Sequence, residues 1–277
     1  MKTLIATACF VLTCLVACVA QEFRVATYNI RYDARSDTGN LWEDRSPHLF
    51  QLIRFHGFDI FGIQEGLKHQ VEALKGGLPG FDYIGVGRDD GREAGEYSAI
   101  FFDTTKFEVV RHGTFWLAEN TAVPNKGWDA ALPRICTWGL FTDKRAGFQF
   151  FLFNTHFDHV GVDARRESAS LIVKKAAELG SGIPMIITGD FNVDQHSDSY
   201  EVLNTGGVVK DAYELASFHY APNGTFNNFD IRRVSESRID HIFLSPPFQV
   251  ERYGILTDSY EGKLPSDHFP VMAVVRY

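Results

Sequence analysis

Residues 185–192 read Met-Ile-Ile-Thr-Gly-Asp-Phe-Asn, a short apolar run that ends in two oxygen-bearing side chains. The run has the length and composition of a buried strand over residues 185–188. Asp190 and Asn192 are one residue apart, so in an extended segment both side chains face the same way and converge on one point. A plain turn is the competing interpretation, because Asp and Asn also favour turns after strands.

Working outward, four other apolar runs are bounded by polar residues of the same chemical kind. These polar residues are Asn29, Glu65, His156 and the pair Asp267-His268. One such boundary carries little weight by itself. Five of them, all made of metal-ligand or acid–base residue types, predict a functional site collected at one rim of a sheet.

The rest of the chain predicts a strand-rich fold. Short β-forming runs occur at residues 23–30, 60–64, 83–86, 99–102, 136–141, 148–154, 185–188, 239–244 and 271–275. Helical patterns occur at residues 47–55, 70–78 and 163–179. Because strands outnumber helices and only a minority alternate with them, we expect an α+β domain, a sandwich of mixed sheets covered by helices. Without a linker-like stretch, residues 21–277 are expected to form this single domain.

The first twenty residues have a different character. Lys2 precedes an apolar run that is short for a membrane span, a pattern typical of a secretory signal peptide over residues 1–20. The protein is therefore expected to be exported, either secreted or periplasmic. The stretch ending at Cys18 also resembles a bacterial lipobox, so a membrane-anchored lipoprotein with lipid on Cys18 is the alternative. Cleavage after Ala20 leaves Cys136 as the one cysteine of the mature chain, and it is expected to pack in the core.

The formal net charge is −8, and no cluster of basic residues is larger than the pairs Arg165-Arg166, Lys174-Lys175 and Arg232-Arg233. A protein that grips long nucleic acid needs an excess of Lys and Arg on at least one face. Tight, extended DNA binding is therefore disfavoured.

Several short motifs, in this order along the chain, resemble those of the endonuclease/exonuclease/phosphatase superfamily, which has the deoxyribonuclease-I-like fold. They are Thr-Tyr-Asn-Ile-Arg-Tyr-Asp around Asn29, Gln-Glu at Glu65, Asn-Thr-His at His156, Gly-Asp-Phe-Asn at residues 189–192, Arg-Ile-Asp-His around Asp240, and Ser-Asp-His at residues 266–268. The resemblance spans nearly all of the mature chain. It implies a four-layer α/β/β/α sandwich of two mixed β-sheets and hydrolysis of phosphate esters with Mg²⁺ or Mn²⁺.

The resemblance also implies a division of labour. Glu65, Asn29 and Asp267 are the expected metal ligands, in keeping with the preference of Mg²⁺ for oxygen donors. For Glu65 the alternative is a surface residue that opens the next helix. Asp190 is expected to orient or deprotonate the attacking water, and Asn192 to steady the phosphate or that water.

His156 and His268 are expected to lie beside the scissile phosphate. The family pattern gives each a carboxylate partner, Glu96 for His156 and Asp240 for His268. A carboxylate fixes the imidazole tautomer and raises its pKa by stabilising the charged ring.

Other residues near the motifs are candidates for substrate contact. Arg134, Arg165 and His159 belong to this group, although each is equally consistent with a structural role. Trp42 and Arg45 are expected at the start of a helix, where they either shape one wall of the cleft or join the core.

The sequence thus predicts an exported, divalent-metal-dependent phosphoesterase that hydrolyses phosphodiester or phosphomonoester bonds, of which a scavenging nuclease is one form. The alternatives are a phosphoinositide or sphingomyelin-type lipid phosphoesterase, and an inactive binding module of the same fold. Residues 236–239, Glu-Ser-Arg-Ile, depart from the Trp-Cys-Asp-Arg pattern of inositol-polyphosphate 5-phosphatases, which disfavours a phosphoinositide substrate. We expect a monomer without an obligate protein partner.

Overall fold

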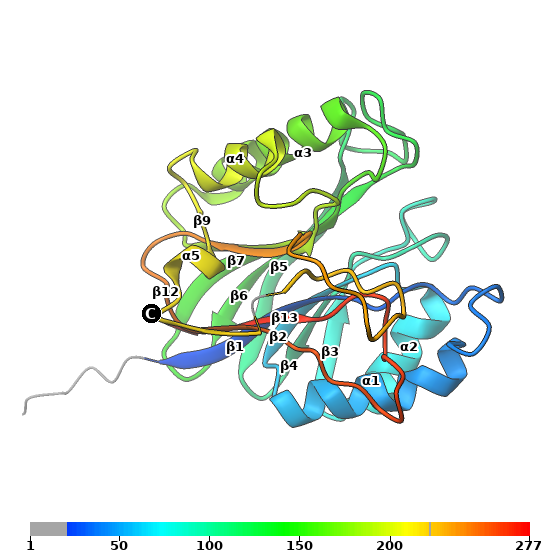
Figure 1. Cartoon of the computed structure of the whole chain (residues 1–277). Coiled ribbons are helices and arrows are strands. Elements are labelled where there is room, and N and C mark those ends of the chain that lie inside the picture. Colours follow the sequence, from blue (N-terminus) through cyan, green and yellow to red (C-terminus); the bar gives the residue numbers. More distant parts are fainter. Residues whose placement is uncertain (1–20, 222) are drawn as a thin grey trace, which may run out of the picture.

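The computed structural model describes residues 21–221 and 223–277. Two β-sheets pack face to face, and helices cover the outer face of each (Figure 1). This arrangement confirms the four-layer α/β/β/α sandwich. The predicted signal peptide and Cys18 lie outside the described residues.

The first sheet has seven strands in the order β10-β12-β13-β1-β2-β4-β3. Its strands are β1 (Glu22–Asn29), β2 (Ile60–Gln64), β3 (Phe81–Ile84), β4 (Ile100–Asp103), β10 (Phe218–Tyr220), β12 (Gln249–Ile255) and β13 (Val271–Arg276). Strands β1 and β2 are parallel neighbours, whereas β1 and β13 are antiparallel. The sheet is therefore mixed.

The second sheet has six strands in the order β5-β6-β7-β8-β11-β9. Its strands are β5 (Phe107–Trp116), β6 (Ile135–Asp143), β7 (Phe148–His156), β8 (Met185–Asp190), β9 (Lys210–Asp211) and β11 (Asp240–Leu244). Here β7 and β8 are parallel, and β11 runs antiparallel to β8. The ends of β7 and β8 and the start of β11 consequently meet at one edge.

The helices divide between the two sheets. In Figure 1, α1 (Trp42–His56) and α2 (Lys68–Gly77) lie below the seven-stranded sheet, and α3 (Val162–Gly180) and α4 (Asp198–Asn204) lie above the six-stranded sheet. The short α5 (Ala212–Leu215) follows β9 directly. All three predicted helices are present, each with its start and end within a few residues of the prediction or, for α1, one turn earlier.

Three apolar cores correspond to the three interfaces between the layers. The core between the sheets includes Phe23, Ile60 and Phe150, and further cores lie beneath α1–α2 and α3–α4. Cys136 belongs to the core beneath α3 and is fully buried, which confirms the predicted packed thiol. Burial raises the pKa of this thiol well above its usual value.

A buried amide links the two sheets close to the rim. The Asn154 side chain on β7 donates to the carbonyl oxygens of Ile63 (2.8 Å) and Ala99 (3.0 Å). Its Oδ1 accepts from Gln64 Nε2 at 2.7 Å and from Thr188 Oγ1 at 3.1 Å. The amide therefore uses its full hydrogen-bonding capacity inside the protein.

Gly62 makes room for this amide. A Cβ at Gly62 would lie 2.1 Å from Asn154 Oδ1 and 2.6 Å from Thr188 Oγ1. Glycine is therefore required here by close approach of the two sheets.

We expect Asn154→Leu to lower the free energy of unfolding by about 3 kcal/mol, because it strands buried donors and acceptors on both sheets. Urea denaturation measures this quantity. Gln149→Leu, at an exposed position of the same strand, is the matched control and should change it by less than about 0.5 kcal/mol. Equal effects of the two substitutions would show that the amide bridge contributes nothing specific.

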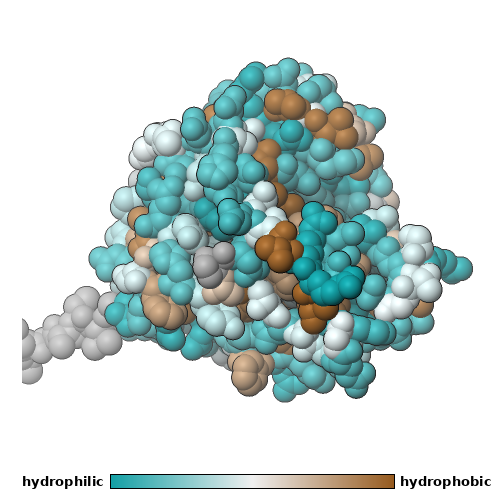
Figure 2. All heavy atoms as spheres, in the orientation of Figure 1, coloured by the Kyte–Doolittle hydropathy of each residue, from teal (hydrophilic) through white to brown (hydrophobic). Residues whose placement is uncertain are grey.

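In residues 21–221 and 223–277, no helix is both long enough and apolar enough to cross a bilayer. The face shown in Figure 2 is mostly hydrophilic, with apolar side chains in separate patches.

Candidate active site

The predicted functional residues meet at one rim of the sandwich. Asn29 ends β1, Glu65 follows β2, His156 ends β7 and Asp190 ends β8. In the strand register, Asp190 stands opposite both His156 on β7 and Asp240 on β11. Chain segments far apart in sequence thus deliver their polar ends to one cleft of about 580 Å³.

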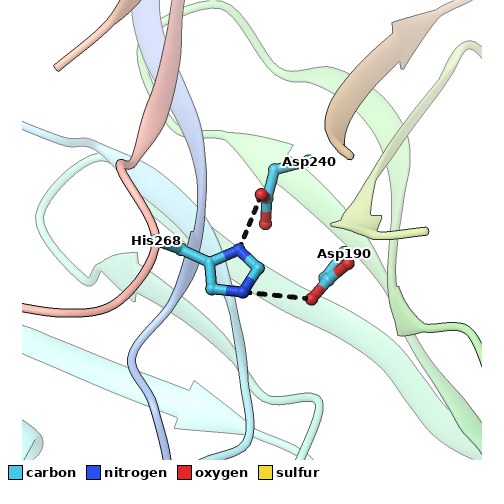
Figure 3. A group of neighbouring side chains, drawn as sticks. All are labelled: Asp190, Asp240 and His268. Carbon is cyan, nitrogen blue, oxygen red and sulfur yellow. Dashed lines mark hydrogen bonds and ion pairs between the residues drawn. The ribbon is translucent and has the colours of Figure 1, made fainter. Parts of the chain in front are cut away.

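A chain of three charged side chains forms the centre of the site (Figure 3). His268 Nδ1 lies 2.8 Å from Asp240 Oδ2, and His268 Nε2 lies 3.7 Å from Asp190 Oδ2. Burial disfavours a charged ring, but the negative charges of Asp240 and Asp190 outweigh it and raise the pKa of His268 well above its usual value. His268 therefore lies between two carboxyl groups that favour its protonated form, and Asp240 is the partner that the sequence pattern predicts.

Asp190 has the properties of a base. Burial, followed by the charge of Asp240, raises the pKa of the Asp190 carboxyl to about 7. Its Oδ2 accepts a hydrogen bond from Asn29 Nδ2 at 2.9 Å, and its Oδ1 accepts one from the backbone N–H of Asn192 at 2.9 Å. Both oxygens are thereby oriented.

Glu65 and Asp267 supply carboxylate oxygens close to Asp190, and Asn29 lies between Glu65 and Asp190 with its Oδ1 accepting from the backbone N–H of Arg31 at 3.0 Å. Asn29 Nδ2 donates to Glu65 Oε1 at 3.0 Å, and the Arg31 guanidinium lies 3.8 Å from both Glu65 Oε2 and Asp267 Oδ2. Burial and the charge of Glu65 raise the pKa of Asp267, although His268 counteracts them. Two neighbouring carboxylates that share one positive partner fit a divalent cation, which takes such oxygen ligands and offsets their repulsion.

The local backbone places Glu65 for this role and not as a helix cap. Glu65 has φ 65°, and its Oε2 accepts from the backbone N–H of Tyr32 at 3.1 Å. Helix α2 begins three residues later, with Leu67 at its N-cap. The Glu65 side chain thus faces the β1 end and the cleft.

A second cluster of possible ligands consists of Asp190, Asp240 and His268, whose ligand atoms lie within 4.8 Å of one another. His268 Nδ1 is already engaged by Asp240 at 2.8 Å. Mg²⁺ and Mn²⁺ prefer oxygen donors to an imidazole nitrogen. The group around Glu65 therefore fits a hard cation better.

Glu96 lies beside His156 as expected, but among the described residues the two side chains form no hydrogen bond. Glu96 forms a two-pronged ion pair with Arg88, at 2.7 Å and 2.8 Å, and its nearest oxygen is 3.8 Å from His156 Nδ1. Burial, followed by the positive charges of Arg134 and Arg88, lowers the pKa of His156 well below its usual value. These effects favour the neutral ring, and the predicted rise in the pKa of His156 does not occur. Its Nε2 still lies 3.6 Å from Asp190 Oδ2.

Asn192 lines the cleft, but it does not lie in an extended segment with Asp190 as predicted. Strand β8 ends at Asp190, and Asn192 has φ 50°, so the two residues do not share an extended segment. The Asn192 side chain donates to the carbonyl oxygen of Phe157 at 2.9 Å. This bond fixes the amide at the cleft wall, where Asn192 and Asp190 are both lining residues.

The three proposed substrate contacts separate into two groups. Arg134 and His159 line the cleft, with Arg134 Nη2 3.0 Å from His159 Nδ1. Within residues 21–221 and 223–277, one terminal nitrogen of the buried Arg134 guanidinium, Nη1, has no hydrogen-bond partner. Arg165 is not a lining residue of the cleft, and it instead donates to the carbonyl oxygen of Asp158 at 3.0 Å. Its position supports the loop that carries His159.

Residues 26–268 match the model of the Endonuclease/Exonuclease/phosphatase family. The chain belongs to the endonuclease/exonuclease/phosphatase family. This span contains every residue of the site described above, from Asn29 to His268. The chain is accordingly a phosphoesterase of this family.

Solved structures of the endonuclease/exonuclease/phosphatase family share the fold closely. A family protein from Bacteroides thetaiotaomicron is 52% identical, with a TM-score of 0.92 over 94% of this chain and 99% of that one. A mannosyl-6-phosphatase from the same organism is 53% identical, with a TM-score of 0.90 over 92% of this chain and 100% of that one. The human nocturnin catalytic domain shares the fold at 20% identity, with a TM-score of 0.72 over 92% of this chain and 93% of that one.

Several cleft residues were not anticipated from the family motifs. Arg31, Tyr32 and Asp37 line the acidic end, and Arg31 Nε lies 2.9 Å from Asp37 Oδ2. Arg31 and Tyr32 stand inside the motif around Asn29, so their proximity to that ligand was the available signal. Asp37 lies in a loop without periodicity, and no pattern in the sequence marks it.

Trp42 and Arg45 are not lining residues of the cleft. They support the site through packing and hydrogen bonds. Trp42 packs in the core beneath α1. Arg45 is almost fully buried and donates to the carbonyl oxygens of Ile30 (2.5 Å), Arg31 (2.6 Å) and Pro265 (3.2 Å). This guanidinium ties the segment after Asn29 to the segment before Asp267.

Arg45→Met is expected to lower the free energy of unfolding by about 3 kcal/mol, since buried carbonyl groups lose charged donors. Chemical denaturation provides the measurement. The exposed Arg54 lies on the same helix, and Arg54→Met should be nearly neutral. A neutral Arg45→Met would contradict the anchoring role.

Proposed function

We propose that this protein is an exported, divalent-metal-dependent phosphoesterase that removes phosphate from small phosphorylated sugars. The observation that carries the proposal is the convergence, in one cleft, of the carboxyl groups of Glu65, Asp190 and Asp267 with the imidazoles of His156 and His268. The choice of substrate rests on the 53% identity to a mannosyl-6-phosphatase over the full length of that protein.

Glu65, Asn29 and Asp267 would hold the cation, Mg²⁺ or Mn²⁺. When bound, the ion would polarise a phosphoryl oxygen and offset the negative charge of the phosphate and the carboxylates. The acidic cleft and the negatively charged substrate are incompatible without such a charge.

Asp190 takes a proton from the attacking water. The hydrogen bonds from Asn29 and Asn192 fix its two oxygens, and burial favours proton uptake. The water oxygen forms a bond to phosphorus as the bond between phosphorus and the ester oxygen breaks. The departing sugar oxygen acquires a proton, so the products are the free sugar and inorganic phosphate.

His268 and His156 act on the phosphate in different ways. Asp240 keeps His268 charged, so Nε2–H can donate to a phosphoryl oxygen or to the leaving oxygen. His156 is neutral and supplies a polar contact without adding positive charge. The two roles differ because His268 Nδ1 contacts the carboxylate of Asp240, whereas among the described residues His156 Nδ1 has no hydrogen-bond partner.

The dimensions and charge of the cleft favour a small ester over a polynucleotide. Its volume of about 580 Å³ falls in the range of about 300–1,000 Å³ typical of small-molecule sites. Arg31 and Arg134 are the only Arg or Lys side chains among its lining residues. A nuclease of long substrates would need cations along an extended track.

Export is proposed from the sequence of residues 1–20 alone. Lys2 followed by an apolar run and the small residues near Ala20 suits a secreted or periplasmic product. Lipid on Cys18 would leave a very short tether to β1 (Glu22–Asn29), which favours the soluble form. We further propose that the protein acts as a monomer.

A substrate panel tests the proposal. Mature protein with Mg²⁺ is incubated with mannose 6-phosphate, glucose 6-phosphate, bis-p-nitrophenyl phosphate, single-stranded DNA and sphingomyelin, and product release is followed for each. We expect the highest kcat/KM for a sugar phosphate. Faster cleavage of DNA or of the lipid would replace the proposed substrate class.

A further inference from the structure

The segment between β10 and β11 forms one wall of the cleft. The side chains of this wall take no part in the proposed chemical step. Phe226, Asn228 and Phe229 all line the cleft, and both phenylalanines are only partly buried. Asn228 is exposed, and in the part of the chain that the structure describes its side chain has no hydrogen-bond partner. Two rings and one free amide thus face the space beside the catalytic groups.

The backbone of this wall adopts an unfavourable conformation. Asn228 has φ 55° and Phe229 has φ 57°, both in the left-handed region. Asn tolerates this region, but for Phe the Cβ makes it costly, and glycine would be the easier residue. A large side chain at such a position indicates that the ring itself is needed.

Specific hydrogen bonds hold the wall in this conformation. The backbone N–H groups of Asn227 and Asn228 both donate to the carbonyl oxygen of Asp267, at 2.7 Å and 3.0 Å. The N–H of Phe229 donates to Asn227 Oδ1 at 2.8 Å. The wall is therefore fixed directly to a proposed metal ligand, and its side chains keep a constant position relative to the phosphate site.

The side chains suit the ring of a sugar. The Phe226 ring lies 5.1 Å from the His268 ring, and Arg233 lies 5.0 Å from the Phe226 centroid, so Phe226 is fixed beside the catalytic imidazolium. An aromatic face carries partial negative charge and attracts the polarised C–H groups of a pyranose. The Asn228 amide can both donate to and accept from hydroxyl groups.

We propose that Phe226, Asn228 and Phe229 bind the pyranose ring of the substrate and make the enzyme select phosphorylated pyranoses over other phosphate esters. This inference rests on the proposed function, and it assigns the specificity to the wall and not to the catalytic groups. The wall sets the position of the sugar, while the residues around Asp190 act on the ester bond.

The test compares mannose 6-phosphate with glycerol 1-phosphate, a monoester that lacks a ring. The quantity measured is the ratio of the two kcat/KM values for the wild type and for Phe229→Gly, Phe229→Ala and Asn228→Ala. We expect each substitution to lower the ratio about tenfold or more, as the loss of a pocket contact does. Phe55→Ala, which removes a highly exposed ring outside the cleft, is the matched control and should leave the ratio unchanged.

Phe229→Gly separates binding from folding. Glycine relieves the left-handed backbone, so this variant should melt no lower than Phe229→Ala while losing the same selectivity. An unchanged ratio in both Phe229 variants would overturn the inference, with the phosphatase activity intact. A wild type that cleaves glycerol 1-phosphate but not mannose 6-phosphate would also overturn it. Failure to cleave any phosphate ester would instead remove the proposed function, and the inference with it.

Discussion

Asp190→Asn is expected to lower kcat by about a thousandfold or more, because the amide cannot accept a proton from water. The substitution preserves the shape of the side chain, and the single amide oxygen can still accept one of the two hydrogen bonds that Asp190 receives from Asn29 and from the backbone N–H of Asn192. The loss should therefore fall on the chemical step and leave KM within the same range. Steady-state phosphate release with saturating Mg²⁺ measures both quantities.

The pH dependence provides a second readout of the same carboxylate. Asp190 works as a base only when it is deprotonated, and its pKa is raised to about 7 in the metal-free protein. The wild-type rate should therefore fall as the pH decreases, and a bound cation should shift this limb to lower pH. Asp198 is an exposed carboxylate in α4. Asp198→Asn is therefore the matched control and should retain the wild-type rate. Equal rates for wild type and Asp190→Asn would exclude Asp190 as the base.

The second large effect is expected from His268→Ala, which should lower kcat by about a thousandfold. The substitution removes the imidazolium that faces the phosphate and leaves Asp190 and Asp240 without the positive charge between them. Added imidazole should restore part of the activity, since it can occupy the space of the lost ring. Circular dichroism would confirm that the variant remains folded.

We propose that Asp240 acts through His268, whose Nδ1 it contacts at 2.8 Å, and not on the substrate. Asp240→Asn should therefore reduce kcat less than His268→Ala, because the ring remains but loses the carboxylate that keeps it charged. The double variant should be no slower than His268→Ala alone, which is the expected result when one residue works through another. Independent, multiplicative losses would show that Asp240 has a separate role.

The sequence predicts those strands whose apolar runs are continuous. β1, β2, β7 and β8 were recognised because buried β-formers dominate them. β5 was missed because its exposed residues, such as Glu108 and His112, interrupt the pattern and a bulge between Val109 and Arg111 breaks the alternation. β12 was missed for a related reason, since a bulge between Val250 and Arg252 shifts its register.

The site was predictable where it depends on strand ends. Asn29, His156 and Asp190 follow apolar runs directly, and the sheet edge brings such residues together. The charge state of His156 was not predictable. It depends on burial of the ring, on the charge of Arg134 and on the charge of Arg88, which lies eight residues before Glu96 and binds both oxygens of that carboxylate.

The wall formed by Phe226, Asn228 and Phe229 could not be predicted from the sequence either. Its segment has no helical or strand periodicity, and its conformation is set by the carbonyl group of Asp267, a distant residue. Residues held by long-range hydrogen bonds to a site leave no local pattern.

We propose that this cleft hydrolyses phosphate esters with the help of a divalent cation. The most direct test is phosphate release from mannose 6-phosphate by the mature protein, first treated with EDTA and then given Mg²⁺ or Mn²⁺. Glu65→Gln is measured in parallel to link the cation to this cleft. We expect no turnover in EDTA, recovery on addition of metal, and a higher metal concentration for half-maximal activity in Glu65→Gln. Full activity in EDTA, or an unchanged metal requirement in Glu65→Gln, would contradict the account.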